Sequence, residues 1–265
     1  WSSGITAKLC GIKSIYHIHE IPFGSKLYES ISRLLIKLVS DKIICVSDSV
    51  LNHWNRGVNS SRISRIYNGI PNFKLKKEKK NKKEFIFMNI SRISPYKGHK
   101  YLLKIAKILL NKKIKFKVKI IGDCAPGYEK YENDIKQIVK TNGLENHIIF
   151  LGFKTNVLKY IKNSSFLIHT PINPDPLPTV IFESLLSKTP VISTDLGGSV
   201  EILDKGNCGL LIPCDDPKKS SNLIEQYIND NKLQKKHLSN FKNLYHKKFR
   251  VEIFEKQIIS QIEKL

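Results

Sequence analysis

The spacing of apolar positions changes abruptly near residue 170. Residues 165–169 (SFLIH) form a short apolar run, which predicts a buried strand. From Pro178 onward the apolar positions recur every three or four residues, which predicts a helix that begins with a proline in the first helical position. The loop between them is rich in prolines, which restrict its backbone. A strand, a stiff loop and a helix start together predict a place where backbone N–H groups hold an anion.

Strands and helices alternate in the same way through the second half of the chain. Near-continuous apolar strands are typical of parallel sheets that are covered on both faces. The predicted strands are residues 84–90, 115–121, 147–151, 165–169, 190–194 and 209–213. Helices are predicted between them, and three more follow from Asp216 to the end. This alternation predicts an α/β fold with a Rossmann-like, doubly wound parallel sheet.

The first part of the chain predicts a smaller set of the same elements. Strands are expected at residues 15–19, 42–47 and 63–67, and Ser47 is suited to cap a helix that ends near Asn55. Residues 25–39 predict an amphipathic helix, because five apolar side chains fall on one side of it: Leu27, Ile31, Leu34, Leu35 and Leu38.

A basic run separates the two parts. Residues 74–84 (KLKKEKKNKKE) have no apolar periodicity, which is typical of a solvated linker. We therefore expect residues 1–73 to be the last part of an N-terminal α/β domain and residues 85–250 to be a complete C-terminal domain. Residues 251–265 are expected to form a helix that is able to pack back on the N-terminal domain.

The chain is strongly basic. The chain has 45 Lys and Arg against 23 Asp and Glu, which gives a formal net charge of +22. Lysines on solvated helix faces are the first interpretation, and attraction to an anionic membrane is the second. Nucleic acid comes last, because the sequence contains no recognised nucleic-acid-binding motif. We therefore expect no nucleic-acid partner.

Other features of the composition narrow the class of protein. A hydrophobic content of 41% is typical of a globular protein, and no apolar run approaches the roughly eighteen residues of a spanning helix. The five cysteines lack the spacing of a metal site and predict free thiols in a reducing compartment. A cytoplasmic protein is expected, with peripheral contact to the inner face of the plasma membrane as an extension of that prediction.

Two cations follow the predicted strand at residues 84–90. Arg92 and Lys97 lie five positions apart in a tight loop, where both can converge on one anion. A guanidinium offers a planar fork that suits phosphate oxygens, and an ammonium acts as a point charge. In so basic a chain, the pair alone is also compatible with a solvated loop.

Two acidic residues bracket the helix start near Pro178. Asp175 lies in the proline-rich loop, where a turn or capping carboxylate is the alternative interpretation. Glu183 lies among apolar neighbours, so its carboxylate needs a partner, and a hydroxyl-bearing ligand is one candidate. A second strand then leads into a turn at Gly197 and Gly198, where the backbone can approach a ligand closely.

A pair of histidines lies in the first predicted strand. His17 and His19 are two positions apart and therefore point to the same face. A metal site would need a third ligand and none is evident, so no metal is predicted. A surface or core histidine pair is the alternative to a functional role.

These motifs together resemble the retaining glycosyltransferases of the GT-B fold, family 4. That family's signature is an acidic residue, seven residues and a Glu, then a small-residue helix, a PVI strand and a GG turn. The corresponding stretch here begins at Asp175, where the family more often has Glu. Residues 91–99 (SRISPYKGH) resemble its GR-x4-KG element, and residues 152–154 (GFK) match its FLG element. The Gly-rich acceptor loop is absent, so the chain looks N-terminally truncated.

The resemblance implies a role for each motif. Arg92 and Lys97 would grip the diphosphate of a nucleotide-sugar donor, and Glu183 would bind the ribose. His19 and Asp175 would orient the transferred sugar. The remaining candidate residues are Leu177, Pro178, Thr179 and Val180 at the diphosphate, Gly152, Phe153 and Lys154 at the base, and Gly197, Gly198 and Glu201 at the second turn.

The resemblance therefore implies a transferase that moves a sugar from a UDP- or GDP-sugar to an acceptor hydroxyl with retention, with no required cofactor or metal. The expected acceptor is a glycan or a lipid-linked molecule in bacterial surface polysaccharide synthesis. No carboxylate pair suits a double displacement, which favours front-face transfer. Three alternatives stay open: a nucleotide-sugar epimerase of GT-B architecture, an inactive nucleotide-binding remnant, and a basic binding protein.

Overall fold

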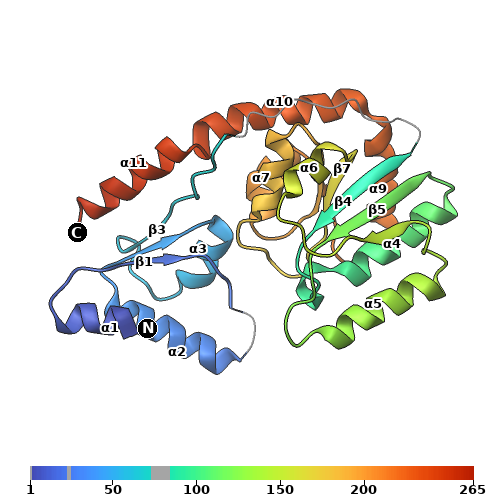
Figure 1. The fold of residues 1–265 in the computed structure, drawn as a ribbon. Helices are drawn as coiled ribbons and strands as arrows, with labels where there is room; N and C mark the ends of the chain where they lie inside the picture. Colours follow the sequence, from blue (N-terminus) through green and yellow to red (C-terminus); the bar gives the residue numbers. More distant parts are fainter. Residues whose placement is uncertain (1, 23–24, 73–83) are drawn as a thin grey trace. The chain divides into compact units, whose positions relative to one another are not determined.

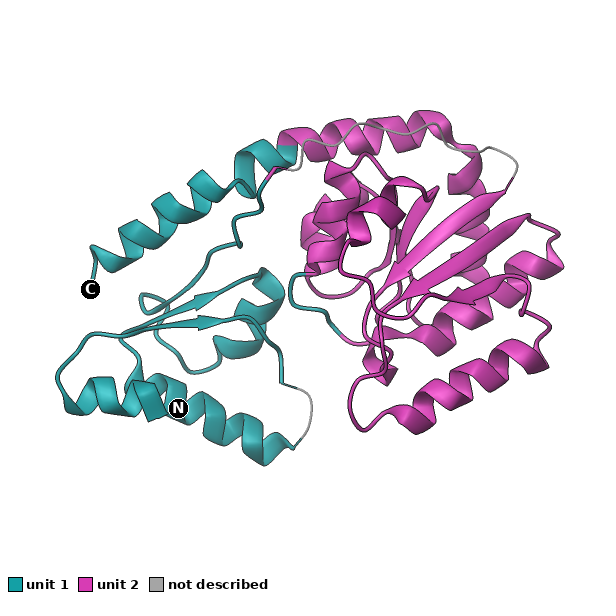
Figure 2. Ribbon diagram, in the orientation of Figure 1, with its two compact units in different colours: residues 1–71, 174–177, 244–265 teal, residues 72–173, 178–243 magenta. Residues whose placement is uncertain are grey.

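The computed structural model describes residues 2–22, 25–72 and 84–265. Its chain divides into two compact units (Figure 2). Unit 1 comprises residues 1–71, 174–177 and 244–265, and unit 2 comprises residues 72–173 and 178–243. The predicted linker at residues 74–84 lies outside the described residues except for its last position.

Unit 2 is built on a six-stranded sheet in which all neighbouring strands are parallel (Figure 1). The strand order is β6-β5-β4-β7-β8-β9, so the order reverses between β4 and β7. This arrangement confirms the predicted doubly wound sheet. Its strands are β4 (Phe85–Ile90), β5 (Phe116–Ile121), β6 (Ile148–Phe150), β7 (Phe166–His169), β8 (Val191–Thr194) and β9 (Leu210–Ile212).

Helices pack in two groups against this sheet. Helix α4 contacts α5 and α9, whereas α7 contacts α6 and α8. A core of aliphatic and aromatic side chains, among them Phe87, Phe116 and Tyr227, lies between the strands and helices α4, α5 and α9. The helices are α4 (His99–Asn111), α5 (Glu129–Thr141), α6 (Val157–Lys162), α7 (Thr179–Leu186), α8 (Gly198–Ile202), α9 (Pro217–Asn229) and α10 (Asn231–Lys248), which continues into unit 1.

Unit 1 contains a three-stranded parallel sheet in the order β1-β2-β3. The strands are β1 (Ile15–Ile18), β2 (Lys42–Cys45) and β3 (Ile63–Arg65), and the helices are α1 (Ser2–Leu9), α2 (Lys26–Val39), α3 (Asp48–Trp54) and α11 (Val251–Ile262). The Ser47 hydroxyl accepts a hydrogen bond from the Val50 N–H at 3.2 Å, which confirms the predicted cap of α3.

The end of the chain belongs to unit 1 through contacts with the segment after β3. The Ile70 N–H donates to the Phe249 carbonyl at 2.8 Å, and the Tyr245 hydroxyl donates to the Ile70 carbonyl at 2.8 Å. The ring of Phe249 is fully buried and lies 4.9 Å from that of Tyr67. These residues therefore form part of the core of unit 1.

Helix α2 forms over the predicted residues, but its apolar side is not buried. Leu27, Leu34 and Leu38 are more than half exposed, whereas Ser32 and Ile36 are buried. The periodicity thus predicted the helix, and the side of the helix that it buries is decided by the packing around it.

Candidate functional site

Two loops meet where the strand order of unit 2 reverses. The Ile172 N–H donates a hydrogen bond to the Tyr96 carbonyl at 3.0 Å, which joins the loop after β7 to the loop after β4. Gly98 has φ +69°, and a Cβ atom there would lie 1.8 Å from the Thr170 carbonyl oxygen. Only glycine fits at this position, because both the backbone conformation and the space exclude a side chain. In doubly wound sheets this reversal point is the usual ligand crevice.

The loops after β5 and β6 are tied to the same structure. The Ile93 N–H donates to the Asp123 carbonyl at 2.8 Å, and the Gly122 N–H donates to the Gly152 carbonyl at 3.1 Å. The Asp123 carboxylate accepts from the Phe153 N–H at 2.8 Å, which fixes the predicted base-binding segment. Sequence reasoning missed this role of Asp123. Its position directly after a predicted strand end was the only available signal.

The two predicted cations lie on the loop after β4. Arg92 is exposed, and its guanidinium has no carboxylate partner within the described part of the chain. Lys97 is half-buried and ends a short 3-10 turn, Pro95–Lys97, directly before Gly98. Arg92 is also the only arginine in the sequence of unit 2. The loop thus presents an exposed guanidinium just after the carboxyl end of β4.

Two histidines lie beneath these loops. His99 and His169 are only 1% and 3% exposed, and the His99 Nε2 lies 3.4 Å from the Ser91 hydroxyl. Burial, with smaller contributions from the Lys97 and His169 charges, lowers the pKa of His99 to about 4. His99 is therefore neutral at physiological pH. Sequence reasoning missed it as part of the site, because the burial of the first residue of α4 depends on segments that are distant along the chain.

Helix α7 begins at Thr179, so Pro178 is the residue before the first helical position rather than that position itself. The difference is small, because an N-cap proline still leads directly into the helix. Leu177 and Pro178 are buried, whereas Thr179 is exposed and Val180 is half-buried. The first turn of α7 therefore lies directly after the loop that follows β7, as the strand–loop–helix pattern predicted, and the positive end of the helix lies there.

Glu183 lies in the second turn of α7 and is half-buried between buried neighbours, Phe182 and Ser184. Burial raises the pKa of its carboxyl group. Within the described residues, the carboxylate has no protein hydrogen-bond partner. Glu183 is thus partly buried, as its apolar neighbours predicted, and a hydroxyl-bearing ligand stays the candidate partner for its carboxylate.

The predicted turn at the end of β8 is also present. Gly197 has φ +58° and ψ −145°, a conformation open to glycine, and it directly precedes α8. Gly198 is buried and Glu201 is half-buried in that helix. The Thr194 hydroxyl donates to the Pro171 carbonyl at 2.7 Å, which connects this strand end to the proline-rich loop.

The other predicted residues fall into unit 1 or project from a loop. Asp175 is half-buried and belongs to unit 1, as does His19, which is exposed directly after β1. Phe153 is 64% exposed in the loop after β6. The site of unit 2 therefore consists of the loops after β4 to β8 and the start of α7.

His17 accompanies His19 in unit 1, with ring centroids 4.3 Å apart. Burial, followed by the charge of His19, lowers the pKa of His17 to about 4. In the described part of the chain, no three His, Cys, Asp or Glu residues gather as a ligand set for a metal ion. No helix of that part is long and apolar enough to cross a bilayer.

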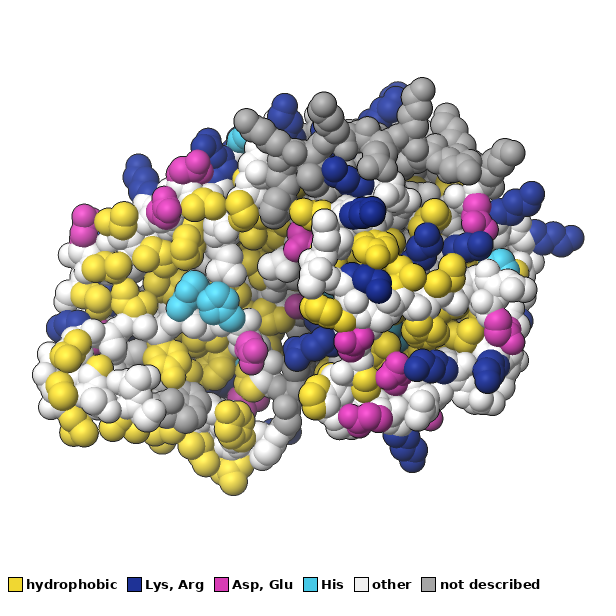
Figure 3. All heavy atoms as spheres, in the orientation of Figure 1, with side chains coloured by type: hydrophobic (Ala, Val, Ile, Leu, Met, Phe, Trp, Pro, Cys, Tyr) yellow, Lys and Arg dark blue, Asp and Glu magenta, His cyan; other side chains and the backbone are white. Residues whose placement is uncertain are grey.

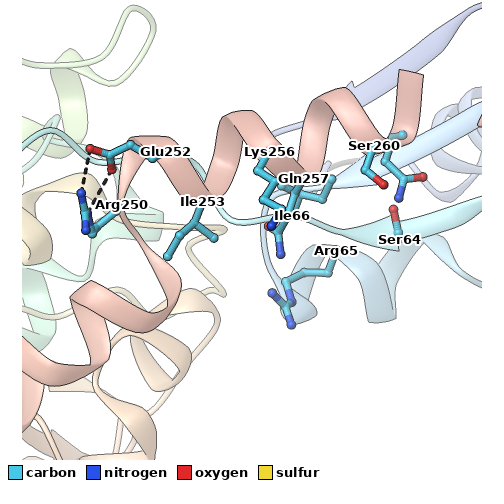
Figure 4. Close-up of a pocket in the computed structure, with 10 residues that line it drawn as sticks. Ser64, Arg65, Ile66, Arg250, Glu252, Ile253, Lys256, Gln257 and Ser260 are labelled. Atoms are coloured by element: carbon cyan, nitrogen blue, oxygen red, sulfur yellow. Dashed lines mark hydrogen bonds and ion pairs between the residues drawn. The ribbon is translucent and has the colours of Figure 1, made fainter. Parts of the chain in front are cut away.

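Unit 1 also contains a cavity of about 540 Å³ between β3 and α11 (Figure 4). The Arg250 guanidinium on its wall pairs with both carboxylate oxygens of Glu252. The Arg65 guanidinium pairs with Asp48 at 3.1 Å and lies 4.1 Å from the centre of the Tyr67 ring. None of the predicted site residues lines this cavity. Its two arginines are engaged by the protein, so it is not a candidate for the site above.

The sheet, its reversal point and the loops there define a Rossmann-like α/β protein, in which the carboxyl ends of β4 and β7 are the expected place for a ligand. The family model for glycosyl transferases group 1 matches residues 72–243. The chain therefore belongs to this glycosyltransferase family.

Individual relatives agree with this assignment. An uncharacterized glycosyltransferase of Methanocaldococcus jannaschii is 33% identical, over 74% of this chain and 52% of its own length. A relative from Campylobacter jejuni, N-acetylgalactosamine-N,N'-diacetylbacillosaminyl-diphospho-undecaprenol 4-alpha-N-acetylgalactosaminyltransferase, is 24% identical over 58% of this chain and 40% of its own length. The chain spans about half the length of the curated relatives it matches.

Solved structures establish the fold. The crystal structure of the Anabaena protein HepE in complex with UDP-glucose matches with a TM-score of 0.88 at 22% identity, and the match covers 99% of this chain and 75% of HepE. The structure is therefore of the GT-B glycosyltransferase type, as the resemblance implied.

Proposed function

We propose that this protein transfers a sugar from a nucleoside-diphosphate sugar to an acceptor hydroxyl, with retention at the anomeric carbon. One observation carries the proposal: the loop with Arg92 and Lys97 is joined to the loop that leads into α7, at the reversal point of the sheet. Cations and helix N–H groups are the groups that bind a diphosphate, and these two joined loops lead to both kinds. The family assignment supports it.

The proposed chemistry is electrostatic. As the bond between sugar and diphosphate breaks, negative charge grows on the leaving phosphate. Arg92, Lys97 and the N–H groups at the start of α7 would stabilise this charge, because they are already oriented before the reaction. Because His99 is neutral at physiological pH, it adds no positive charge that would repel these two cations. No metal ion is needed for this step.

A donor whose diphosphate lies at Arg92, Lys97 and the start of α7 also implies roles for the other candidate residues. Glu183 would accept hydrogen bonds from the ribose hydroxyls, which supply the partners that its carboxylate lacks. His19 and Asp175 would orient the transferred sugar, and residues 152–154 would border the base. We propose front-face transfer assisted by the leaving phosphate. A covalent glycosyl adduct on Asp175 would overturn this step.

The donor and acceptor are proposed by class. A UDP-sugar is supported by the similarity to HepE, which was crystallised with UDP-glucose. A lipid-linked or glycan acceptor in surface polysaccharide synthesis is supported by the diphospho-undecaprenol acceptor in the name of the Campylobacter jejuni relative. Such an acceptor lies at a membrane, so we propose a cytoplasmic protein in peripheral contact with the inner face.

Calorimetric titration with UDP and with GDP tests the donor site. We expect UDP to bind the wild-type chain in the micromolar range and Arg92→Ala to weaken binding at least about tenfold, because charge-assisted hydrogen bonds contribute about 1.5–3 kcal/mol. Arg92→Lys should recover only part of that loss, since Lys keeps the charge but not the fork. Glu183→Ala should also weaken binding.

Arg56→Ala is the matched control, because Arg56 is an exposed arginine of unit 1 and is predicted to leave UDP affinity unchanged. Unchanged affinity in Arg92→Ala, or no binding of either nucleotide to the wild-type chain, would refute the donor site. If GDP binds more tightly than UDP, the donor site is supported and the base of the donor is guanine rather than uracil.

A further inference from the structure

The loops after β4, β5 and β6 are joined to one another through one residue, Asp123. Its backbone carbonyl accepts a hydrogen bond from the Ile93 N–H at 2.8 Å, and its carboxylate accepts one from the Phe153 N–H at 2.8 Å. Ile93 directly follows Arg92, and Phe153 lies in segment 152–154, which the proposed function places at the base. Asp123 therefore connects the loop proposed to bind the diphosphate with the segment proposed to border the base.

The contact of this residue with the loop after β4 is made by the main chain. The Ala125 N–H also donates to the Ile93 carbonyl, at 3.1 Å. Gly122 has φ +138°, and a Cβ atom there would lie 2.1 Å from the Ser91 carbonyl oxygen, so the two loops approach each other closely. The main chain on both sides of Arg92 is therefore held by contacts that a change of the side chain at position 123 does not remove.

The contact with the loop after β6 depends instead on the Asp123 side chain. The Gly122 N–H donates to the Gly152 carbonyl at 3.1 Å, and the N–H of the next residue, Phe153, bonds the Asp123 carboxylate. Gly152 has φ +65°, a left-handed conformation that turns the chain after β6. A substitution of Asp123 therefore removes a bond to segment 152–154 while the main-chain bonds stay.

The residue that this bond holds has an exposed aromatic ring. Phe153 is 64% exposed, and it is the only exposed phenylalanine among the residues that the structure describes. On the face of unit 2 shown in Figure 3, apolar side chains lie among many Lys and Arg side chains. An exposed ring on a basic surface suits a ligand that combines a flat base with negative phosphates.

Other exposed apolar side chains of unit 2 lie at the same edge of the sheet. In the described part of this unit, the large apolar side chains that are exposed are Tyr96, Phe153 and Ile172. They lie on the loops after β4, β6 and β7, at the carboxyl ends of the strands. This is the edge at which doubly wound sheets bind ligands, so a contact with ligand explains their exposure.

We propose that Asp123 is a positioning residue for the donor nucleotide: its carboxylate holds segment 152–154 beside the loop after β4, so that the base stacks on the Phe153 ring. This role of Asp123 rests on the proposed function and specifies how its base site is built. The base and the diphosphate of one nucleotide are separated by a ribose, so the two loops that bind them need a fixed spacing. Aromatic stacking tolerates different bases, so the ring accepts uracil or guanine.

Calorimetric titration of the whole chain with UDP, and with inorganic pyrophosphate, which has no base, tests this role. We expect Asp123→Ala to weaken UDP binding about fivefold and Phe153→Ala about tenfold, without a change in pyrophosphate affinity. Asp123→Asn should bind UDP as the wild type does, because its amide oxygen accepts the same N–H. If GDP binds more tightly than UDP, the same changes are expected with GDP.

The double variant Asp123→Ala/Phe153→Ala should bind UDP little more weakly than Phe153→Ala alone, since Asp123 acts through that ring. All these variants should fold, because both side chains are exposed. Circular dichroism verifies this.

Fluorescence gives a readout that a purely structural role of Asp123 would not change. The sequence has two tryptophans, Trp1 and Trp54, so the signal of Phe153→Trp minus that of the wild type reports on position 153. UDP should quench this added signal, because the base stacks on the indole ring, whereas pyrophosphate should not. With Asp123→Ala added, saturating UDP should quench it less.

Asp230→Ala is the matched control, because the Asp230 carboxylate is also exposed in unit 2 and accepts a backbone N–H, that of Leu233, at 2.8 Å. This control should bind UDP as the wild type does. Unchanged UDP affinity in Asp123→Ala, an equal loss of UDP and pyrophosphate affinity, an equal loss in Asp123→Asn, or no quenching in Phe153→Trp would overturn the role of Asp123.

The two levels of the assignment fail separately. If Arg92→Ala weakens UDP binding while Asp123→Ala and Phe153→Ala do not, the proposed function stands and only the role of Asp123 is refuted. If the wild type binds neither UDP nor GDP, both the donor site and the role of Asp123 are refuted.

Discussion

The position of Arg92 in the fold, rather than its residue type alone, makes it a candidate for phosphate binding. The sequence has six arginines and many lysines, and Arg92 alone lies in unit 2. It stands on the loop at the reversal point of the sheet, where a planar fork can meet two phosphate oxygens. A lysine in that position would carry the same charge with less directional bonding. The UDP affinity of Arg92→Lys therefore distinguishes the contribution of the positive charge from that of the planar hydrogen-bonding fork.

The ionised carboxylate of Glu183 lowers the stability of the folded protein, as expected of a residue that binds a ligand. Burial raises the pKa of its carboxyl group, so the ionised form is disfavoured in the folded state relative to the unfolded state. The resulting stability is present below the unfolded pKa and is lost as pH rises through the folded pKa. A half-buried carboxylate that lowers stability at neutral pH is expected where a ligand supplies its partners.

We predict that Glu183→Gln raises the thermal midpoint at pH 7.5, because the amide removes the buried charge. The difference from the wild type should shrink as pH falls toward 4, where the wild-type carboxyl group becomes protonated. Thermal unfolding at both pH values measures this. Glu145→Gln, at an exposed position in unit 2, serves as the control. A difference that stays constant between the two pH values would contradict the prediction.

At the scale of elements, the contact between the loops after β4 and β7 depends on Gly98. Its φ of +69° is unfavourable for other residues, and the Thr170 carbonyl occupies the space of a side chain. A change at this position therefore strains the backbone and separates the two loops. The strand ends supply the positions of these loops, but the glycine permits the close approach.

We predict that Gly98→Ala destabilises the protein by at least about 2 kcal/mol, through backbone strain and displacement of the loops. UDP affinity should fall at least tenfold with it. Gly143→Ala is the matched control: Gly143 has φ +65°, but nothing lies within 4 Å of the added Cβ. Chemical denaturation and UDP titration compare the two variants. Equal losses of stability and affinity in both would show that the close approach to Thr170 is unimportant.

At the scale of the whole molecule, the chain returns to its first unit at its end. Helix α10 begins in unit 2 and finishes in unit 1, where Leu244, Tyr245 and Phe249 are buried. Segments far apart in the sequence therefore share one core. The stability of unit 1 depends on residues that follow unit 2 in the chain.

We predict that Phe249→Ala destabilises unit 1 by about 3–5 kcal/mol, as expected for removal of a fully buried aromatic ring. Hydrogen exchange should accelerate at the amides of β2 in unit 1 and change less at those of β5 in unit 2. Phe153→Ala is the control for loss of an aromatic ring, since Phe153 is 64% exposed. Equal acceleration in both sheets would mean that the two units unfold together.

Much of the fold was predictable from the sequence because strand and helix periodicities are local. Near-continuous runs such as residues 84–90 predicted the buried parallel strands, and Ser47 predicted a helix cap that the structure contains. Motif order and spacing predicted the glycosyltransferase family. The roles of the individual site residues and the domain boundaries stay predictions.

Other features required the tertiary structure. The sequence alone gave no reason to join Asp123 to Phe153 or to place His99 in a buried position, because these contacts bring together loops that are distant along the chain. The apolar side of α2 was predicted, but its exposure was not, since burial depends on which elements pack around a helix. Periodicity and motifs thus determined the elements and the family, whereas packing between distant segments decided which side chains face one another, the core or the solvent.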